Sequence, residues 1–524
     1  GVSWDPETHE VTTPDGFPEA WEKKRKNGYV GMTTPTEYGG SGAPYTLGTA
    51  LSEISVATNK SLAIGGLSSG LTMALLANGT DEQKEKYIPK LASGEWTATM
   101  ALTEPHAGTD LGLIRTKAEP QDDGSYRISG KKIWITSGEH DLTDNILHFV
   151  LAKLPDAPEG TKGISAFLVP KVLEDGEPND LYCSGIEHKM GVHASPTCEM
   201  TFEGARGYLV GGPHEGMRSM FVMMNEARLK VGIEGPALSE IAYQTALAFA
   251  KERRQSRSLD PDKREEDHPA DTIMVHPDVR RMLANVKAST EGMRALATWV
   301  AILLDISHAH PDDQTAREAD DLVALLTPII KAYCSERGFE NVSEALQVTG
   351  GAGYTRDMHI EQYLRDMRIA MIYEGTNHIQ ALDLVGRKVP KDNGRLFRAF
   401  QSKVTELIRR TSDVDELSEF VDPLKDASKQ LSELTMKLGA RASEDREQAG
   451  AVASNYLKLF ALVAIGYAWL RQLAYAHETD HPMADTKRKT ARYFFRMLLP
   501  ETESLARIID EGKEHMMAFD RDEF

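Results

Sequence analysis

The spacing of apolar residues along the chain changes twice, and these two changes limit the possible folds most strongly. Residues 1–98 and 214–390 repeat apolar side chains at helical spacing, whereas residues 99–213 consist of short alternating runs separated by Gly and Asp turns. A run of strands between two helical segments is typical of an α+β protein. We therefore expect a mostly α protein with an N-terminal helical domain, a middle β-barrel or β-sandwich domain, and a C-terminal helical bundle.

Local signals predict individual elements within this plan. A capped helix is expected to begin at residue 80 or 81, because acidic side chains fill the turn that follows. Asn145–Lys153 and Gly163–Val169 are strand candidates in the middle segment. The run 126–136 predicts a hairpin that bends at residues 129–130.

A boundary falls at Pro390–Gly394, where Pro, Asp, Asn and Gly gather within five residues. Residues 391–524 beyond it contain further amphipathic helical repeats and one strongly apolar run, Leu459–Leu470. That run is too short to span a bilayer and predicts a buried helix. The tail is therefore expected to form an additional, independent C-terminal helical domain.

Composition and charge narrow the class of protein. The 524 residues are 41% hydrophobic and 27% charged, which is typical of a globular protein with large cores. The net charge of −19 disfavours nucleic acids and acidic membranes as partners. The chain opens without a signal-peptide pattern and its three cysteines are widely separated, which favours a reducing, cytoplasmic location. Neither the cysteines nor the histidines have metal-ligand spacing, so we expect no metal site.

Glu374 is the strongest catalytic candidate in the chain. It follows an apolar pair and precedes a Gly, directly before a helix start that Thr376 or Asn377 could cap. A lone carboxylate with apolar neighbours at a helix start is the arrangement expected of a general base with a tuned pKa. An ordinary helix entry has the same residue pattern, and for this stretch alone it is the favoured interpretation.

Two motifs in the middle segment have side chains that could hold a flat polar ring or a phosphate. Thr103 and Thr109 lie in a loop rich in Pro, Gly and hydroxyl side chains. Trp134 and Thr136 alternate onto the same face of a strand, where a ring could stack and hydrogen-bond. A rigid turn and an ordinary core Trp are the alternative interpretations.

Two further features could serve a phosphate. The Gly-rich stretch Gln347–Gly353 ends a helix, and such backbone can approach a pyrophosphate or simply cap the helix. Arg253, Arg254 and Arg257 form a basic cluster in an acidic protein, for which a solvated helix end is an equally good explanation.

The order and spacing of these motifs along the chain resemble those of the acyl-CoA dehydrogenase family. The resemblance rests on Thr103-Glu-Pro-x-Ala-Gly-Thr-Asp, Trp134-Ile-Thr, Gln347-x-x-Gly-Gly-x-Gly and Ile372-Tyr-Glu-Gly-Thr, and covers residues 20–390. The tail resembles the larger branch of the family, which has an extra C-terminal helical domain. The resemblance implies FAD as cofactor, an acyl-CoA thioester as substrate, abstraction of the α-proton by Glu374 and transfer of a β-hydride to the flavin.

The same resemblance implies roles for individual residues. Glu374 is the expected catalytic base, and electron-transferring flavoprotein is the expected electron acceptor of a homodimeric enzyme. The expected substrate contacts are Arg228, Tyr373, Gly375 and Ser195. The expected FAD contacts are Met100, Leu102, Thr103, Thr109, Trp134, Thr136, Arg253, Gln347, Gly350, Gly351, Thr376 and His378.

Some positions depart from the family pattern. The usual Arg-x-x-Phe-Gly reads Arg253-Arg-Gln-Ser-Arg and runs into a charged insertion, and the usual Arg-x-Ser reads His193-Ala-Ser. Ala227 occupies the position at which some members carry the base, so Glu374 has no rival there. The acyl chain length is left open by these motifs. An oxygen-using oxidase is an alternative function, and a nucleic-acid-associated flavoprotein is another that the negative charge disfavours.

Overall fold

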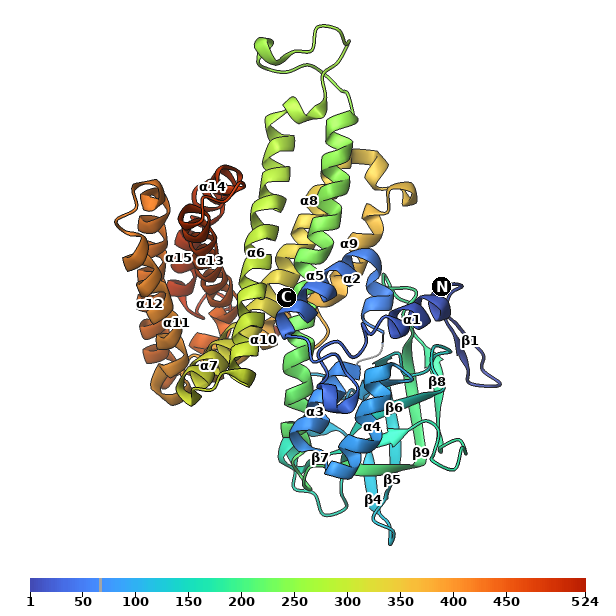
Figure 1. Ribbon diagram of the computed structural model, residues 1–524. Coiled ribbons are helices and arrows are strands. Elements are labelled where there is room, and N and C mark those ends of the chain that lie inside the picture. The colour runs from blue at the N-terminus through green and yellow to red at the C-terminus, as the bar shows by residue number, and fades with distance from the viewer. Residues whose placement is uncertain (66–67) are drawn as a thin grey trace. The chain divides into compact units, whose positions relative to one another are not determined.

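The computed structural model describes residues 1–65 and 68–524, which divide into two compact units, Gly1–Ala227 and Arg228–Phe524. The large sheet belongs to the first unit, and long helices make up the second (Figure 1). The chain is thus mostly helical with its strands in the middle, which confirms the predicted fold class.

In the first unit, helices α3 and α4 pack against the sheet through a core that includes Leu75, Ile88 and Phe149. Thr80 caps α4 and forms a capping box with Gln83, which confirms the predicted helix start. The helices are α1 (Phe17–Lys26), α2 (Tyr45–Ala63), α3 (Ser68–Asn78) and α4 (Asp81–Ser93). The strands are β1 (Ser3–Trp4), β2 (Val11–Thr12), β3 (Trp96–Ala101), β4 (Lys117–Pro120), β5 (Tyr126–Thr136), β6 (Asn145–Lys153), β7 (Ile164–Pro170), β8 (Leu181–Ile186) and β9 (Thr197–Val210).

The sheet has the strand order β3-β6-β4-β5-β9-β7, with β8 paired to β9. Because β6 also pairs with β7, the strands β6, β4, β5, β9 and β7 close into a barrel-like ring. Strands β6 and β7 confirm the two predicted strand candidates.

The predicted hairpin at 126–136 is wrong. Strand β5 is continuous through Gly130, because β9 pairs with it from one end to the other. The Gly that suggested a turn serves close packing instead: a Cβ at Gly130 would lie 2.4 Å from the hydroxyl of Thr116.

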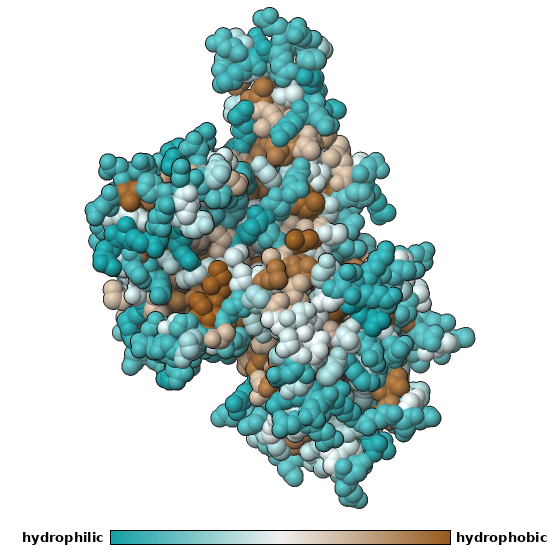
Figure 2. Space-filling model, in the orientation of Figure 1, coloured by the Kyte–Doolittle hydropathy of each residue, from teal (hydrophilic) through white to brown (hydrophobic). Residues whose placement is uncertain are grey.

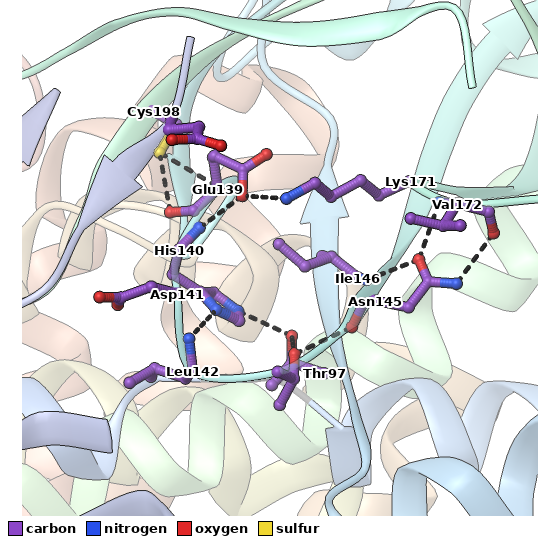
Figure 3. Close-up of polar contacts among 12 residues, drawn as sticks. Thr97, Glu139, His140, Asp141, Leu142, Asn145, Ile146, Lys171, Val172 and Cys198 are labelled. Atoms are coloured by element: carbon purple, nitrogen blue, oxygen red, sulfur yellow. Dashed lines mark hydrogen bonds and ion pairs between the residues drawn. The ribbon is translucent and has the colours of Figure 1, made fainter. Parts of the chain in front are cut away.

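A buried polar cluster holds the segment between β5 and β6 (Figure 3). His140 Nε2 hydrogen-bonds with Thr97 Oγ1 at 2.8 Å, and Lys171 Nζ donates to Glu139 Oε1 at 2.6 Å. Burial lowers the pKa of His140 to about 4, so its ring is neutral at physiological pH. The cluster therefore holds this segment with hydrogen bonds and one ion pair.

The second unit consists of long helices joined by short turns. They are α5 (Gly216–Glu252, which begins in the first unit), α6 (Pro277–Ala309), α7 (Asp313–Ile329), α8 (Ser335–Gly353), α9 (Ile360–Arg368), α10 (Asn377–Asp383), α11 (Lys391–Thr411), α12 (Ser418–Glu444), α13 (Arg446–Glu478), α14 (Ala484–Tyr493) and α15 (Glu501–Glu511). π-Helical turns occur at Ile330–Cys334, Leu384–Lys388 and Phe494–Leu498.

The tail beyond residue 390 is helical, as predicted, but it is not an independent bundle. One continuous core joins α11 to α15 with α6 and α7, and Trp469 of α13 donates from Nε1 to the carbonyl of Ala288 in α6 at 3.3 Å. Helix α13 contains the predicted buried run. It is long and apolar enough to cross a membrane, but 72% of its most apolar window is buried, as is typical of a core helix.

The charged insertion forms an ordered loop at the tip between α5 and α6, where Figure 2 shows a hydrophilic surface. The buried carboxylate of Asp271 accepts hydrogen bonds from the backbone N–H groups of Ser258 (2.6 Å) and Glu265 (2.7 Å) and pairs with Arg257 (3.3 Å). Arg254 pairs with Glu265 at 2.6 Å. Two of the three clustered arginines therefore stabilise their own loop.

Candidate active site

The predicted site residues fall into two groups, one in each compact unit, and each group is described by itself. The first unit contains Met100, Leu102, Thr103, Thr109, Trp134, Thr136 and Ser195. The second contains Arg228, Arg253, Gln347, Gly350, Gly351, Tyr373, Glu374, Gly375, Thr376 and His378.

Glu374 lies at a strained bend just before α10. Its φ of 56° is in the left-handed region, which a Glu residue rarely adopts, and Gly375 follows with a φ of 84°. The buried amide of Gln380 holds the bend by donating to the carbonyl oxygens of both residues at 3.2 Å. Thr376 caps α10 by accepting from the N–H of Ile379 at 3.3 Å, which confirms one of the two predicted caps. A strained backbone held in this way favours the catalytic interpretation over an ordinary helix entry.

The carboxyl group of Glu374 has a shifted pKa. Burial raises the pKa to about 7; Arg228 and Lys331 oppose this shift, and Glu234 adds to it. One carboxyl oxygen, Oε2, is buried without a hydrogen-bond partner among the described residues. A carboxyl group of this kind is partly ionised near neutral pH and is a stronger base than an exposed carboxylate.

Arg228 is buried on α5, close to the same bend. Its Nη1 lies 3.5 Å from Oδ2 of Asp383, and the other oxygen of Asp383 lies 2.7 Å from Nε of Arg387. Within the described residues, Nε of Arg228 has no hydrogen-bond partner. The predicted role of Arg228 as a substrate contact near the base is compatible with this unused donor and stays a prediction.

Two charged residues of this site were not predicted from the sequence. Lys331 is fully buried and donates from Nζ to Oδ1 of Asn377 at 3.1 Å. Glu234 is buried on α5 and accepts a hydrogen bond from the hydroxyl of Tyr373. Each is a lone charge in an apolar helical run, and that is the signal by which both could have been found.

Trp134 is an exposed aromatic residue on the sheet. Its side chain is 60% exposed and its φ is 60°, at an irregularity where β5 shifts its pairing with β9. The indole N–H donates to Oε1 of Glu187 at 3.2 Å. The alternative of an ordinary core Trp is therefore wrong, because more than half of the side chain lies outside the core.

The loop that begins at Thr103 is fixed to β5 by a buried ion pair. Lys132 donates from Nζ to the carbonyl of Leu102 at 3.0 Å and to Oε1 of Glu104 at 2.9 Å. Thr109 is exposed and Thr103 is half-buried. The loop is thus a rigid turn whose threonines lie outside the core, so the structural and the ligand-binding interpretations are compatible.

The remaining residues of the second unit include an open stretch of backbone. Gly350 breaks the regular geometry of α8 with a φ of 58°, and a Cβ at Gly350 or Gly351 would meet no atom within 4 Å. Gln347 and Arg253 are exposed. This backbone is accessible to a large polar group such as a pyrophosphate.

Of two further predicted residues, one is exposed and one is buried. His378 hydrogen-bonds from Nδ1 with Oγ of Ser454 on α13 at 3.1 Å. Ser195 is buried, with no partner for its hydroxyl among the described residues. Their roles in binding FAD and substrate stay predictions.

Family models match most of the chain in four consecutive parts. The acyl-CoA dehydrogenase N-terminal, middle and C-terminal domains match residues 3–95, 99–205 and 214–389. The model described as acetyl-CoA dehydrogenase C-terminal like matches residues 400–520.

Individual relatives agree with these models. A 3-methylmercaptopropionyl-CoA dehydrogenase of Ruegeria pomeroyi is 40% identical over 98% of this chain and 88% of its own. A butyryl-CoA dehydrogenase of Syntrophomonas wolfei is 35% identical over 83% of this chain and 74% of its own. The fold is shared with an acyl-CoA dehydrogenase from Bacillus anthracis complexed with FAD, at a TM-score of 0.78 and 24% identity, over 94% of this chain and 82% of that one. The chain belongs to the acyl-CoA dehydrogenase family.

Proposed function

We propose that this enzyme is an FAD-dependent acyl-CoA dehydrogenase in which Glu374 removes the α-proton of an acyl-CoA thioester to form a 2-enoyl-CoA. The observation that carries the assignment of the base is the Glu374 carboxyl group itself, which lies on a strained bend and has its pKa raised to about 7. Family membership supports the substrate class and the reaction.

The residues present fit a flavin nucleotide. In the first unit, Trp134 has an exposed aromatic side chain, and Thr109 lies exposed in the rigid loop. In the second unit, the backbone at Gly350 and Gly351 is open enough for a pyrophosphate. When bound, FAD supplies the acceptor for the hydride from the β-carbon.

The chain supplies the proton chemistry. The unpartnered Oε2 of Glu374 is free to accept the α-proton. By family resemblance, the backbone N–H of Glu374 donates to the thioester oxygen and stabilises the developing enolate. An apolar acyl chain excludes water from the carboxylate and makes it more basic.

The pH dependence of turnover tests the state of the base. Only the carboxylate form of Glu374 accepts a proton, and burial places its pKa at about 7. We therefore expect kcat/KM to rise as pH increases through about 7 and then to level off. Rates measured at saturating electron acceptor between pH 5 and pH 9 would show this rise. A nearly flat profile over that range, as expected for an exposed Glu with a pKa of about 4.3, would contradict it.

The proposed substrate is 3-methylmercaptopropionyl-CoA, with methylthioacryloyl-CoA as product, as in the demethylation route of dimethylsulfoniopropionate breakdown. The relative of that name, 40% identical over 98% of the chain, supports it. Fatty acyl-CoA thioesters of short, medium or long chain are the alternative, and the butyryl-CoA dehydrogenase relative favours the short ones. A pocket that discriminates chains of similar shape usually does so by only about 10- to 200-fold.

A kinetic panel separates these substrates. The purified holoenzyme would be assayed with 3-methylmercaptopropionyl-, butyryl-, octanoyl- and palmitoyl-CoA under one set of conditions. The highest kcat/KM for the first thioester supports the proposal, and an equal or higher value for a fatty acyl-CoA contradicts it.

The electron acceptor, the oligomeric state and the cellular location of the enzyme are also proposals from the family resemblance. We expect electrons to pass to electron-transferring flavoprotein, from a cytoplasmic homodimer. Turnover with that flavoprotein but not with oxygen alone would exclude the oxidase alternative, and light scattering of the holoenzyme would measure the assembly.

A further inference from the structure

Lys331 is a fully buried lysine at a π-helical turn. Its side chain is 0% exposed, and the turn Ile330–Cys334 joins α7 to α8. Burying an ammonium group is unfavourable unless other groups compensate its charge. π-Helical turns are frequent at functional sites because the extra residue displaces side chains from the regular helix face. A fully buried lysine at such a turn therefore needs neighbours that compensate its charge.

Lys331 is part of a clamp on the start of α10. Its Nζ donates to Oδ1 of Asn377 at 3.1 Å, and Ser335 donates from Oγ to the same oxygen at 3.2 Å. In return, Nδ2 of Asn377 donates to the carbonyl of Ala332 at 3.1 Å. Asn377 is the first residue of α10, directly after the bend that carries Glu374. The clamp therefore fixes one end of that bend to the π-helical turn.

Lys331 also acts on Glu374 through its charge. Its ammonium lowers the pKa of Glu374, and the carboxylate in turn raises that of Lys331, which burial lowers to about 8. Arg228 provides the other cation, but its guanidinium is already paired with Asp383. Lys331 hydrogen-bonds to a neutral amide instead, and the negative charges that favour its ammonium form are those of Glu234 and Glu374.

Other charged and titratable groups of this unit lie around Lys331 and Glu374. They are Arg228 and Glu234 on α5, Glu336 on α8, Tyr373 at the bend, Asp383 on α10, and Arg387 and Lys388 in the turn that follows.

We propose that Lys331 is a positioning residue of the dehydrogenation: its buried ammonium anchors the start of α10 through Asn377 and stabilises the ionised form of Glu374. This inference rests on the proposed role of Glu374 as the base. The reaction needs a carboxylate in a site that strongly disfavours charge, and Lys331 provides an opposite charge without forming a direct ion pair that would weaken the base.

The Lys331→Met variant of the holoenzyme tests the charge. Without the ammonium, we expect the acid limb of kcat/KM to move up by on the order of one pH unit, which is about a tenfold loss of rate below the limb and less above it. Lys331→Arg should leave the limb within a few tenths of a unit of its original position, because the charge remains. Lys429→Met, which removes an exposed lysine paired with Glu433, is the matched control and should have no effect.

A second measurement is independent of turnover. Infrared difference titration would follow the protonated carboxyl band that is absent in Glu374→Gln, and its midpoint should shift with Lys331→Met by the same amount as the kinetic limb. Lys331→Gln, which keeps a donor for Asn377 but no charge, should show the same shift and serves if the Met variant fails to fold.

The outcomes separate the two proposals. An unmoved limb and an unmoved infrared midpoint in both neutral variants would overturn the role of Lys331, even if stability falls. Near-normal turnover of Glu374→Gln would instead overturn the base assignment.

Discussion

Replacing Glu374 with Gln is expected to give a folded protein that keeps FAD and loses turnover by about 10²- to 10⁴-fold, the usual contribution of a general base. The amide has nearly the same size as the carboxyl group. Because Oε2 of Glu374 has no hydrogen-bond partner among the described residues, the substitution breaks no contact of that atom. Arg228 keeps its pairing with Asp383. Turnover, flavin absorbance per protein and thermal stability would be measured on the same preparation.

Glu234→Gln is the matched comparison, because it removes another buried carboxylate of the same site. Its side chain still accepts the hydrogen bond from Tyr373 through the amide oxygen, so we expect a much smaller loss of rate. Losing one negative neighbour should also lower the pKa of Glu374, because Glu234 raises it. Near-normal turnover of Glu374→Gln, or an equal loss in both variants, would contradict the base assignment.

Features that depend on local sequence could be predicted. The helix start after Glu374 follows from a cap residue and the spacing of apolar side chains, and the structure has Thr376 as the cap. The start of α4 and the positions of β6 and β7 follow in the same way. The mostly α fold class follows from the change of periodicity along the chain.

Features that depend on packing between distant segments could not be predicted. Gly130 has the sequence context of a turn, but β9, some seventy residues later, pairs along the whole of β5 and keeps it extended. The tail has the pattern of a separate bundle, but α13 buries its apolar side chains against α6 and α7. The sequence shows that an apolar face exists, and tertiary contacts decide which segment covers it.

The residues of the candidate site also divide into those that local sequence predicts and those that depend on distant packing. Glu374 could be predicted, because its motif lies within a few residues. Lys331 stands out as a lone charge in an apolar helical run, but its place beside α10 could not be predicted, since it depends on a π-helical turn and on an Asn side chain from another helix. The ion pair between Glu104 and Lys132 could not be predicted either, because the expected hairpin did not place Lys132 beside the loop that begins at Thr103.

Replacing Lys132 with Met is expected to destabilise the first unit by about 3–5 kcal/mol, the usual cost of breaking a buried ion pair. Lys132 and Glu104 have side-chain exposures of 0% and 3%, with 2.9 Å between Nζ and Oε1. Burial lowers the pKa of Lys132 to about 8, so its amine is still protonated at neutral pH. Burial alone would raise the pKa of Glu104, but the charge of Lys132 and hydrogen bonds from Thr116 and Arg115 lower it, so the pair stays ionised. Methionine would leave that carboxylate buried without its cation.

Lys131→Met is the matched control, because the neighbouring lysine is half exposed and pairs with Glu199 at the surface, where such a pair contributes below about 1 kcal/mol. Urea titrations would compare the two variants, and a double-mutant cycle with Glu104→Gln would isolate the coupling. Since Lys132 also holds the carbonyl of Leu102, the loop beginning at Thr103 should loosen and flavin content should fall only in Lys132→Met. Equal losses of stability in the two lysine variants would contradict the buried pair, and full flavin content in Lys132→Met would show that this loop is not needed to hold the cofactor.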